Sequence, residues 1–235
     1  MRKSFTERSA ILFAAVLCST LMFGAGQAMA QASINEIRID QPSTDNDEYF
    51  ELFGPSGSSL TGLTYVVIGD GTGVSGVIEA VVDLTGQTIP ASGYFVAAEA
   101  TFTLGAADFV TTLDFENSDN VTHLLVTGFT GSNGDDLDTD DDCVLDVIPW
   151  TGVVDGVALI EEPNPPASTE CHYGDDLGLP GVGPDGSFVP GHVGRDPDSF
   201  GPWIIGDFDP LNGTDTPGSS NRGTIPVELM AFEVE

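Results

Sequence analysis

The stretch DDLDTDDDCVLD, residues 135–146, places seven aspartates in twelve positions. Three of them occupy positions 1, 3 and 5 of a loop, the spacing at which alternating carboxylates converge on one hard cation. A backbone carbonyl at position 7 and an aspartate at position 9 add the oxygen ligands that calcium prefers. The stretch therefore predicts a calcium site built from Asp138, Asp140, Asp142, the carbonyl of Val144 and Asp146.

Two positions of this stretch depart from the helix-loop-helix calcium hand. Cys143 stands where glycine normally makes the sharp turn, and Pro149 stands where a bidentate glutamate belongs. The pattern is instead similar to the D-x-D-x-D-D-G-x-x-D loops of exported calcium-stabilised repeats. Carboxylates about 6 Å apart repel each other by roughly 0.7 kcal/mol per pair even in water, which favours a bound cation. A solvated acidic loop without a metal is the alternative.

The cysteines predict a disulfide at this loop. Cys18 lies in the N-terminal apolar segment, which leaves Cys143 and Cys171 as a pair. An even pair in an exported protein is typical of a disulfide, although two free thiols are the alternative. Closing a loop of this length stabilises a protein by roughly 3 to 4 kcal/mol on the chain-entropy model. The bond would hold the acidic loop in shape at the position that lacks glycine.

The N-terminal segment has the three parts of a secretory signal peptide. Three basic residues precede an apolar run over residues 10–22, and Ala-Met-Ala at residues 28–30 supplies a small-x-small cleavage site. About thirteen apolar residues are fewer than the roughly twenty that a membrane-spanning helix needs. We therefore expect residues 1–30 to be removed, with a second possible cleavage site two residues further on. The mature protein is expected to be secreted or attached to the cell surface, without membrane insertion.

The composition of the exported part excludes several chemistries. Removing residues 1–30 changes the formal net charge from −31 to −33, because that segment carries three basic residues and one acidic residue. The remaining chain has no lysine, and its basic residues are Arg38, Arg195 and Arg222. This balance argues against nucleic acid and anionic lipid as partners, and the lack of lysine excludes Schiff-base and phosphate-loop lysine chemistry. So acidic a surface needs divalent cations or a salty medium to reduce its repulsion.

No catalytic motif is recognisable in the sequence. The chain contains neither G-x-S-x-G nor H-E-x-x-H, and its three histidines have no characteristic neighbours. The strand pattern predicts that His123 is half-buried, and His172 after Cys171 falls short of the ligand spacing of a zinc site. Trp150, Phe200 and Trp203 could stack on sugars, but we expect them to close the ends of the fold.

The spacing of apolar runs predicts an all-β fold. Glycine and proline interrupt the chain about every ten residues, and the runs between them are β-branched, aromatic or alternating, which favours a β-sandwich or barrel. A helical turn is expected only at 106–108, and residues 162–224, with few strand signals besides 200–205, are expected to form long loops. Six residues are predicted to share one core: Phe50, Leu52, Val66, Ile68, Phe95 and Leu125. The predicted strands span 33–39, 48–53, 63–69, 76–84, 93–98, 120–127 and 152–161.

Several of these strands carry a family resemblance. INEIRID, DNDEYFELFGPSGSSLTGLTYVV and TIPASGYFVAAE resemble the successive opening strands of a bacterial lamin tail domain, and DTPGSSN at 215–221 resembles its close. The resemblance implies an immunoglobulin-like sandwich over residues 31–224, with long acidic loops rich in glycine and proline. Residues 225–235 form a C-terminal tail in which PVELMAF is similar to a junction that precedes sorting domains in exported bacterial proteins.

Together these features predict an exported, non-enzymatic binding module, stabilised by calcium, whose partner is an extracellular or cell-surface ligand. Lamin tail domains occur beside exported nucleases, phosphatases and surface proteins, where they resemble attachment modules, although a fold does not define an activity. The rival hypothesis is a metal-dependent hydrolase, of the nuclease or phosphatase kind, whose acids lie in loops 135–146 and 174–186. A metal pocket joining those two loops would favour the rival.

Overall fold

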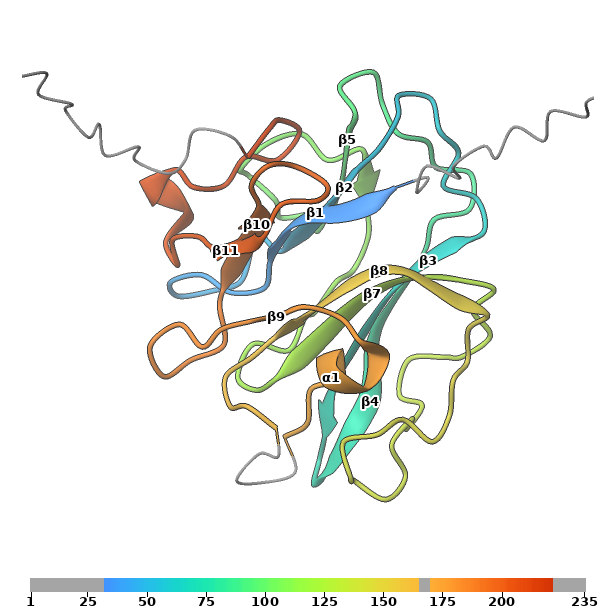
Figure 1. The fold of residues 1–235 in the computed structure, drawn as a ribbon. Coiled ribbons are helices and arrows are strands. Elements are labelled where there is room, and N and C mark those ends of the chain that lie inside the picture. Colours follow the sequence, from blue (N-terminus) through green and yellow to red (C-terminus); the bar gives the residue numbers. More distant parts are fainter. Residues whose placement is uncertain (1–31, 165–169, 222–235) are drawn as a thin grey trace, which may run out of the picture.

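A computed structural model describes residues 32–164 and 170–221 as an all-β sandwich of two packed sheets (Figure 1). The predicted signal peptide and C-terminal tail lie outside the described residues. No helix among the described residues is long and apolar enough to span a membrane. The fold class predicted from the spacing of the apolar runs is thus confirmed.

The first sheet has six strands in the order β11-β10-β1-β2-β5-β6. Its neighbours pair in antiparallel fashion except β5 and β6, which are parallel. β2 is central, as the aromatic residues on both of its faces predict. The strands are β1 (Ser33–Arg38), β2 (Tyr49–Phe53), β5 (Tyr94–Ala98), β6 (Phe109–Val110), β10 (His192–Arg195) and β11 (Trp203–Ile205).

The second sheet has five strands in the order β4-β3-β7-β8-β9. β4, β3, β7 and β8 pair in antiparallel fashion, with β7 beside β3 instead of β4, and β9 adds a short parallel edge. Its strands are β3 (Leu63–Gly71), β4 (Val74–Asp83), β7 (Val121–Thr127), β8 (Gly152–Leu159) and β9 (Gly181–Val182). The two helical turns are α1 (Gly174–Leu177) and the 3-10 turn η1 (Pro210–Asn212).

The main core lies between the sheets. β1 turns Ile34 and Ile37 inward, although they are three residues apart, because its pairing with β2 shifts register between Ile34 and Glu36. This irregularity leaves Glu36 and Arg38 on the outer face of the sheet. Phe50 from β2 stacks on Tyr65 from β3, with ring centroids 3.7 Å apart, and so joins the two sheets.

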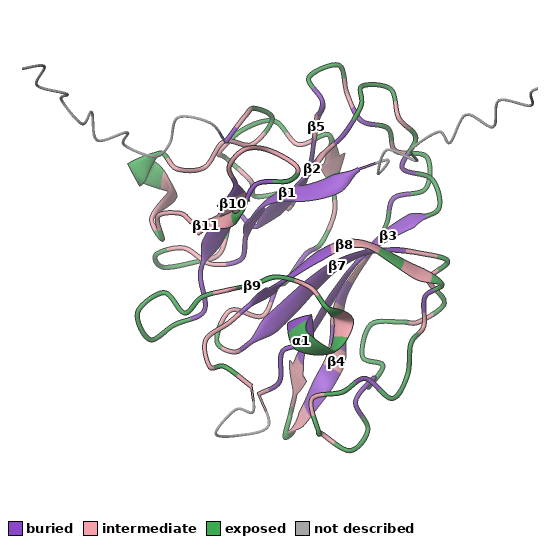
Figure 2. Ribbon diagram, viewed as in Figure 1, coloured by how far each residue is buried: buried purple, intermediate pink, exposed green. Residues whose placement is uncertain are grey.

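Both sheets also carry buried apolar residues on their outer faces, and loops cover these faces (Figure 2). Val66 and Ile68 point away from the main core and pack under Leu137, Trp150 and other residues of the loops that flank β8. On the other sheet, Tyr49, Val96 and Ala98 form a small cluster with residues 102–107. A strand with two apolar faces needs cover on both sides, which explains why long loops lie flat over this sandwich.

The structure differs from three predictions about the fold and confirms the predicted strands. The six predicted core residues are all buried, but Val66 and Ile68 belong to the outer cluster instead of the main core. Residues 106–108 form no helical turn. Residues 162–224 contain β9, β10 and β11 as well as loops. The predicted strands 33–39 through 152–161 correspond to the seven longest strands of the structure.

Candidate functional site

The predicted metal loop is docked on the edge of the second sheet. The N–H of Ile78 in β4 donates to the carbonyl of Asp135 at 2.9 Å, and the N–H of Leu137 donates to the carbonyl of Gly76 at 2.9 Å. Gly76 has φ +77°, and a Cβ at this position would meet Asp138 and the Tyr173 hydroxyl at less than 3 Å. The loop therefore lies where only glycine fits beneath it, and it covers an otherwise unpaired strand edge.

Asp138 is the buried anchor of this loop. Its carboxylate accepts hydrogen bonds from the N–H groups of Asp142, at 3.2 Å, and Cys143, at 2.9 Å, and from the Tyr173 hydroxyl, at 2.9 Å. The side chain is fully buried. Burial, first of all, and the hydrogen bond to Asp138 raise the pKa of Tyr173 far above its ordinary value, so this tyrosine stays a hydrogen-bond donor.

The disulfide between Cys143 and Cys171 is present, as the sequence predicts. Cys143 itself adopts the left-handed conformation, with φ +68°, at the position where calcium loops commonly carry glycine. Non-glycine residues adopt this conformation at an energetic cost, so other contacts must hold the turn. The bond to Cys171 and the N–H donated to Asp138 both restrain this residue.

Three of the five predicted calcium ligands converge. Oxygens of Asp138, Asp140 and Asp146 all lie within 4.8 Å of one another. The charge of the neighbouring Asp142 is the largest cause that raises the pKa of Asp140, and the charges of Asp146 and Asp138 add to it. Asp140 is exposed. Among the described residues, only the backbone of Asp142 forms a hydrogen bond with its carboxylate.

The other two predicted ligands are not part of that group. The carboxylate of Asp142 accepts the N–H of Val144 at 3.0 Å, which closes a local turn. Val144 is an exposed residue. Asp146 accepts the N–H of Thr139 at 2.9 Å, so its side chain also shapes the loop. Asp142, Val144 and Asp146 therefore have structural contacts in addition to any role toward a cation, whereas Asp140 has only its contact with the backbone of Asp142.

The two loops of the rival hypothesis lie next to each other. The N–H of Leu145 donates to the carboxylate of Asp176 in α1 at 3.2 Å, and the disulfide links the same regions. The two clefts described below are lined by neither Asp176 nor any residue of 135–146. The loops thus pack directly against each other instead of facing one another across either cleft.

A second acidic region was not anticipated from the sequence. Oxygens of Asp70, Glu79 and Glu116 lie within 4.8 Å of one another, and those of Asp119, Glu161 and Glu170 form a similar group. Burial, followed by the charge of Glu116, raises the pKa of Glu79 to about 8. Because thirty-six acidic residues follow residue 30, spacing alone could not select these six.

A polar cleft of about 480 Å³ adjoins this region. Glu48 lies in its wall, is 4% exposed, and has both carboxylate oxygens near the N–H of Phe115, at 3.2 and 3.3 Å. Burial is the largest cause that raises the pKa of Glu48 to about 8, and the charges of Glu99 and Asp45 add to it. Glu48 therefore has little compensation for its burial.

A buried network of charges fixes the C-terminal segment on β1. Arg38 binds Asp215 through Nε, at 2.6 Å to Oδ1, and through Nη2. The Oε1 atom of Glu36 lies 2.9 Å from Nε2 of His192 and accepts the N–H of Thr216 at 2.9 Å. These pairings join residues more than 150 positions apart, and they bring DTPGSSN, residues 215–221, over the outer face of the first sheet.

Glu36, His192 and Thr214 have the order of a carboxylate, an imidazole and a hydroxyl, but their geometry indicates a structural role. Nδ1 of His192 lies 3.5 Å from the Thr214 hydroxyl, a long separation for proton transfer. That hydroxyl also accepts the N–H of Asp207 at 2.8 Å. The three side chains thus hold the 207–216 segment in place.

The remaining single-residue predictions have mixed outcomes. His123 is completely buried instead of half-buried; its Nδ1 is 2.9 Å from the Tyr65 hydroxyl, and burial lowers its pKa to about 3. His172 is buried and belongs to none of the metal-capable groups of the described residues. Trp150 closes the outer cluster as predicted, whereas Phe200 is 79% exposed. Trp203 packs at the edge of the main core.

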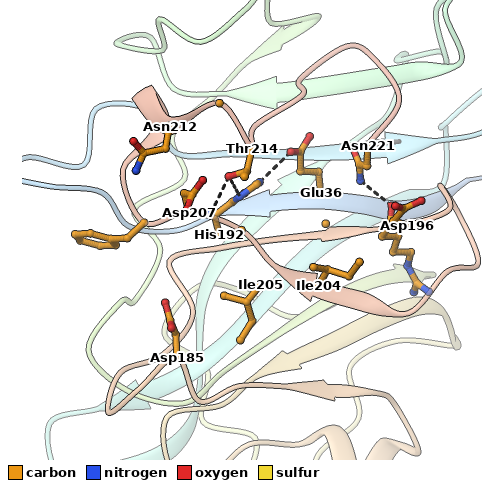
Figure 3. A pocket seen from close by; sticks show the side chains of 15 residues that line it. Glu36, Asp185, His192, Asp196, Ile204, Ile205, Asp207, Asn212, Thr214 and Asn221 are labelled. Atoms are coloured by element: carbon orange, nitrogen blue, oxygen red, sulfur yellow. Dashed lines mark hydrogen bonds and ion pairs between the residues drawn. The ribbon is translucent and has the colours of Figure 1, made fainter. Parts of the chain in front are cut away.

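A larger cleft of about 730 Å³ lies beside β10 and β11 (Figure 3). Its walls combine buried polar groups, exposed carboxylates and aliphatic side chains. This cleft could not be predicted from the sequence, because its lining comes from β1, the 183–188 turn and several segments between 192 and 221.

Comparison with known proteins returned no matching family model, curated protein or solved structure. The resemblance to lamin tail domains therefore stays a prediction from the motifs of the sequence.

Proposed function

We propose that this protein is an exported, non-enzymatic module of the lamin tail type that binds an extracellular or cell-surface ligand and is stabilised by calcium. The observation that carries the calcium assignment is the convergence of Asp138, Asp140 and Asp146 in a loop restrained by a disulfide. Hard carboxylate oxygens are the ligands that calcium prefers, and a cation would relieve their repulsion.

Export is supported by two independent features. The N-terminal segment has the pattern of a signal peptide, and the Cys143–Cys171 bond belongs to oxidising compartments. A binding role is favoured over catalysis because the histidines at 123 and 192 are engaged in internal hydrogen bonds. The rival, a metal-dependent hydrolase, is less favoured, because its two acidic loops pack against each other at Leu145 and Asp176 and do not share either cleft.

Calcium titration of the full chain tests the proposal. We expect the melting temperature to rise at micromolar to millimolar calcium, with about 2.7 kcal/mol of stabilisation at 100 times the dissociation constant. Asp140→Asn should weaken this response, because it removes one carboxylate charge from the converging group without breaking the loop. Asp138 is unsuitable for this test, since it accepts three hydrogen bonds.

Asp142→Asn is the matched control, because it removes one charge from the same loop while an amide oxygen can still accept the N–H of Val144. It should keep most of the calcium response. Monovalent salt should stabilise all three proteins gradually and alike, by screening. A calcium response in Asp140→Asn equal to that of the parent would show that the stretch is only a solvated loop. Calcium-dependent phosphodiesterase or phosphatase activity lost in Asp140→Asn would instead favour the rival.

A further inference from the structure

The 730 Å³ cleft beside β11 has two chemically different parts (Figure 3). Ile204 and Ile205 of the edge strand β11, with Phe208 just beyond it, give the cleft an aliphatic and aromatic wall. Phe208 is an exposed aromatic residue. Apolar side chains that stay accessible inside a cleft favour ligands with a hydrocarbon part.

Three carboxylates line the same cleft. In the view of Figure 3, Asp185 and Asp207 lie on one side of the two isoleucines and Asp196 on the other. Among the described residues, none donates a hydrogen bond to the side chains of these three aspartates. Glu36 differs, because it lines the cleft but is bonded to His192 and Thr216.

The positive groups around the cleft are already engaged. Arg195 donates to Asp155 at 2.8 Å and to the carbonyl of Ile34 at 2.9 Å, and its guanidinium stacks 4.5 Å from the ring centroid of Trp203. His192 is held by Glu36. Among the described residues that line the cleft, no other basic side chain is present, so these aspartates are open to a cationic ligand.

We propose that this cleft binds an organic cation, namely an ammonium or guanidinium group on an aliphatic chain. Methylene groups would pack on Ile204, Ile205 and Phe208, while the cationic end would donate charge-assisted hydrogen bonds to the carboxylates of Asp207 and Asp185. The same chemistry is offered by a lysine or arginine side chain of a partner polypeptide and by a free diamine. This inference rests on the proposed binding role and gives it a ligand class.

The alternatives use only one part of the cleft. An inorganic cation would gain nothing from the apolar wall. A neutral sugar could stack on Phe208 and bond to Asn212, but it would leave the carboxylates without compensating charge. The combination of free carboxylates with an apolar wall therefore favours an aliphatic cation over both.

Isothermal titration of the full chain with pentane-1,5-diamine, ethylamine and pentane-1,5-diol tests the inference. We expect the diamine to bind at least tenfold more tightly than ethylamine, because ethylamine lacks most of the hydrocarbon chain and the second ammonium group, and the neutral diol not to bind. Asp185→Asn and Asp207→Asn should each weaken diamine binding about tenfold, the effect of losing one charge-assisted hydrogen bond. Neither side chain has a structural partner, so both variants should fold.

Asp175→Asn is the charge-matched control, because it removes one carboxylate that does not line the cleft. Its diamine affinity should stay within about twofold of the parent, as expected for screened charges outside a site. A tetrapeptide with one central lysine, N-acetylated and C-amidated, identifies the source: tighter binding than the diamine indicates a polypeptide partner, and weaker binding a free amine.

Equal weakening in Asp175→Asn would overturn the inference, because it would mean that only net charge matters. Binding of the diol or of glucose as tight as that of the diamine would also overturn it, in favour of a neutral ligand. The calcium response separates this test from the proposed function, since Asp185→Asn and Asp207→Asn should keep it. If the parent is stabilised by calcium but does not bind the diamine, the cleft assignment alone is rejected. If the parent binds the diamine but is not stabilised by calcium, the calcium site alone is rejected.

Discussion

The acidic loop at 135–146 and the network around Arg38 solve the same problem, the placement of carboxylates in a fold, in opposite ways. In the loop, Asp138 is compensated mainly by N–H groups four and five residues away. In the network, Asp215 is compensated by Arg38 from a strand 177 residues earlier in the chain. Local hydrogen bonds to Asp138 shape a loop in which other carboxylate oxygens can bind a cation. The distant ion pair instead holds the segment 215–221 on the first sheet.

The largest effect is expected where a buried charge loses its distant partner. Arg38→Met should cost about 3–5 kcal/mol of unfolding free energy, because Asp215 is then left buried without its guanidinium. Chemical denaturation measures the loss. The double variant Arg38→Met with Asp215→Asn should recover part of the stability, since it removes the stranded charge. A loss below about 1 kcal/mol in the single variant would mean that the network does not hold the C-terminal segment.

A smaller effect is expected from the covalent link of the loop. Cys143→Ser with Cys171→Ser should cost roughly 2–4 kcal/mol, because the unfolded chain regains the freedom of the 28-residue separation. The double variant should also bind calcium more weakly, since Cys143 would be free to leave its left-handed conformation. Denaturation with and without calcium measures both terms. An unchanged calcium affinity would separate the disulfide from the proposed metal site.

Glu48 supplies the third case, a buried carboxylate with little compensation of either kind. Its pKa is raised to about 8 in the folded state, so the stabilising contribution is complete below the unfolded pKa near 4.5 and is lost as the pH rises through 8. With a chelator present to remove divalent cations, we expect the unfolding free energy of the parent protein to fall by roughly 1–3 kcal/mol between pH 5 and pH 8.

Glu48→Gln should flatten this dependence, because the amide does not ionise. Denaturation midpoints at several pH values measure the difference between the variant and the parent. Glu79 has a similarly raised pKa, so some dependence should remain in the variant. Identical pH profiles for parent and variant would show that Glu48 does not titrate in this range.

Much of the local structure could be predicted from the sequence. Alternation of apolar and polar residues marks a strand because successive side chains point to opposite faces, and the seven longest strands follow that pattern. The count of cysteines outside the N-terminal segment left one possible pair, Cys143 and Cys171. The acidic loop was recognisable because its ligand spacing lies within nine residues.

The tertiary structure decided what depends on distant contacts. The sequence does not reveal that Val66 faces a loop instead of the main core, because periodicity assigns residues to two faces without naming what covers each. It also does not separate Asp140 from Asp142 as a candidate ligand, since that difference arises from the turn at Cys143. The Glu36–His192 pair and the cleft beside β11 arise only when segments more than 150 residues apart meet, and no local pattern encodes that meeting.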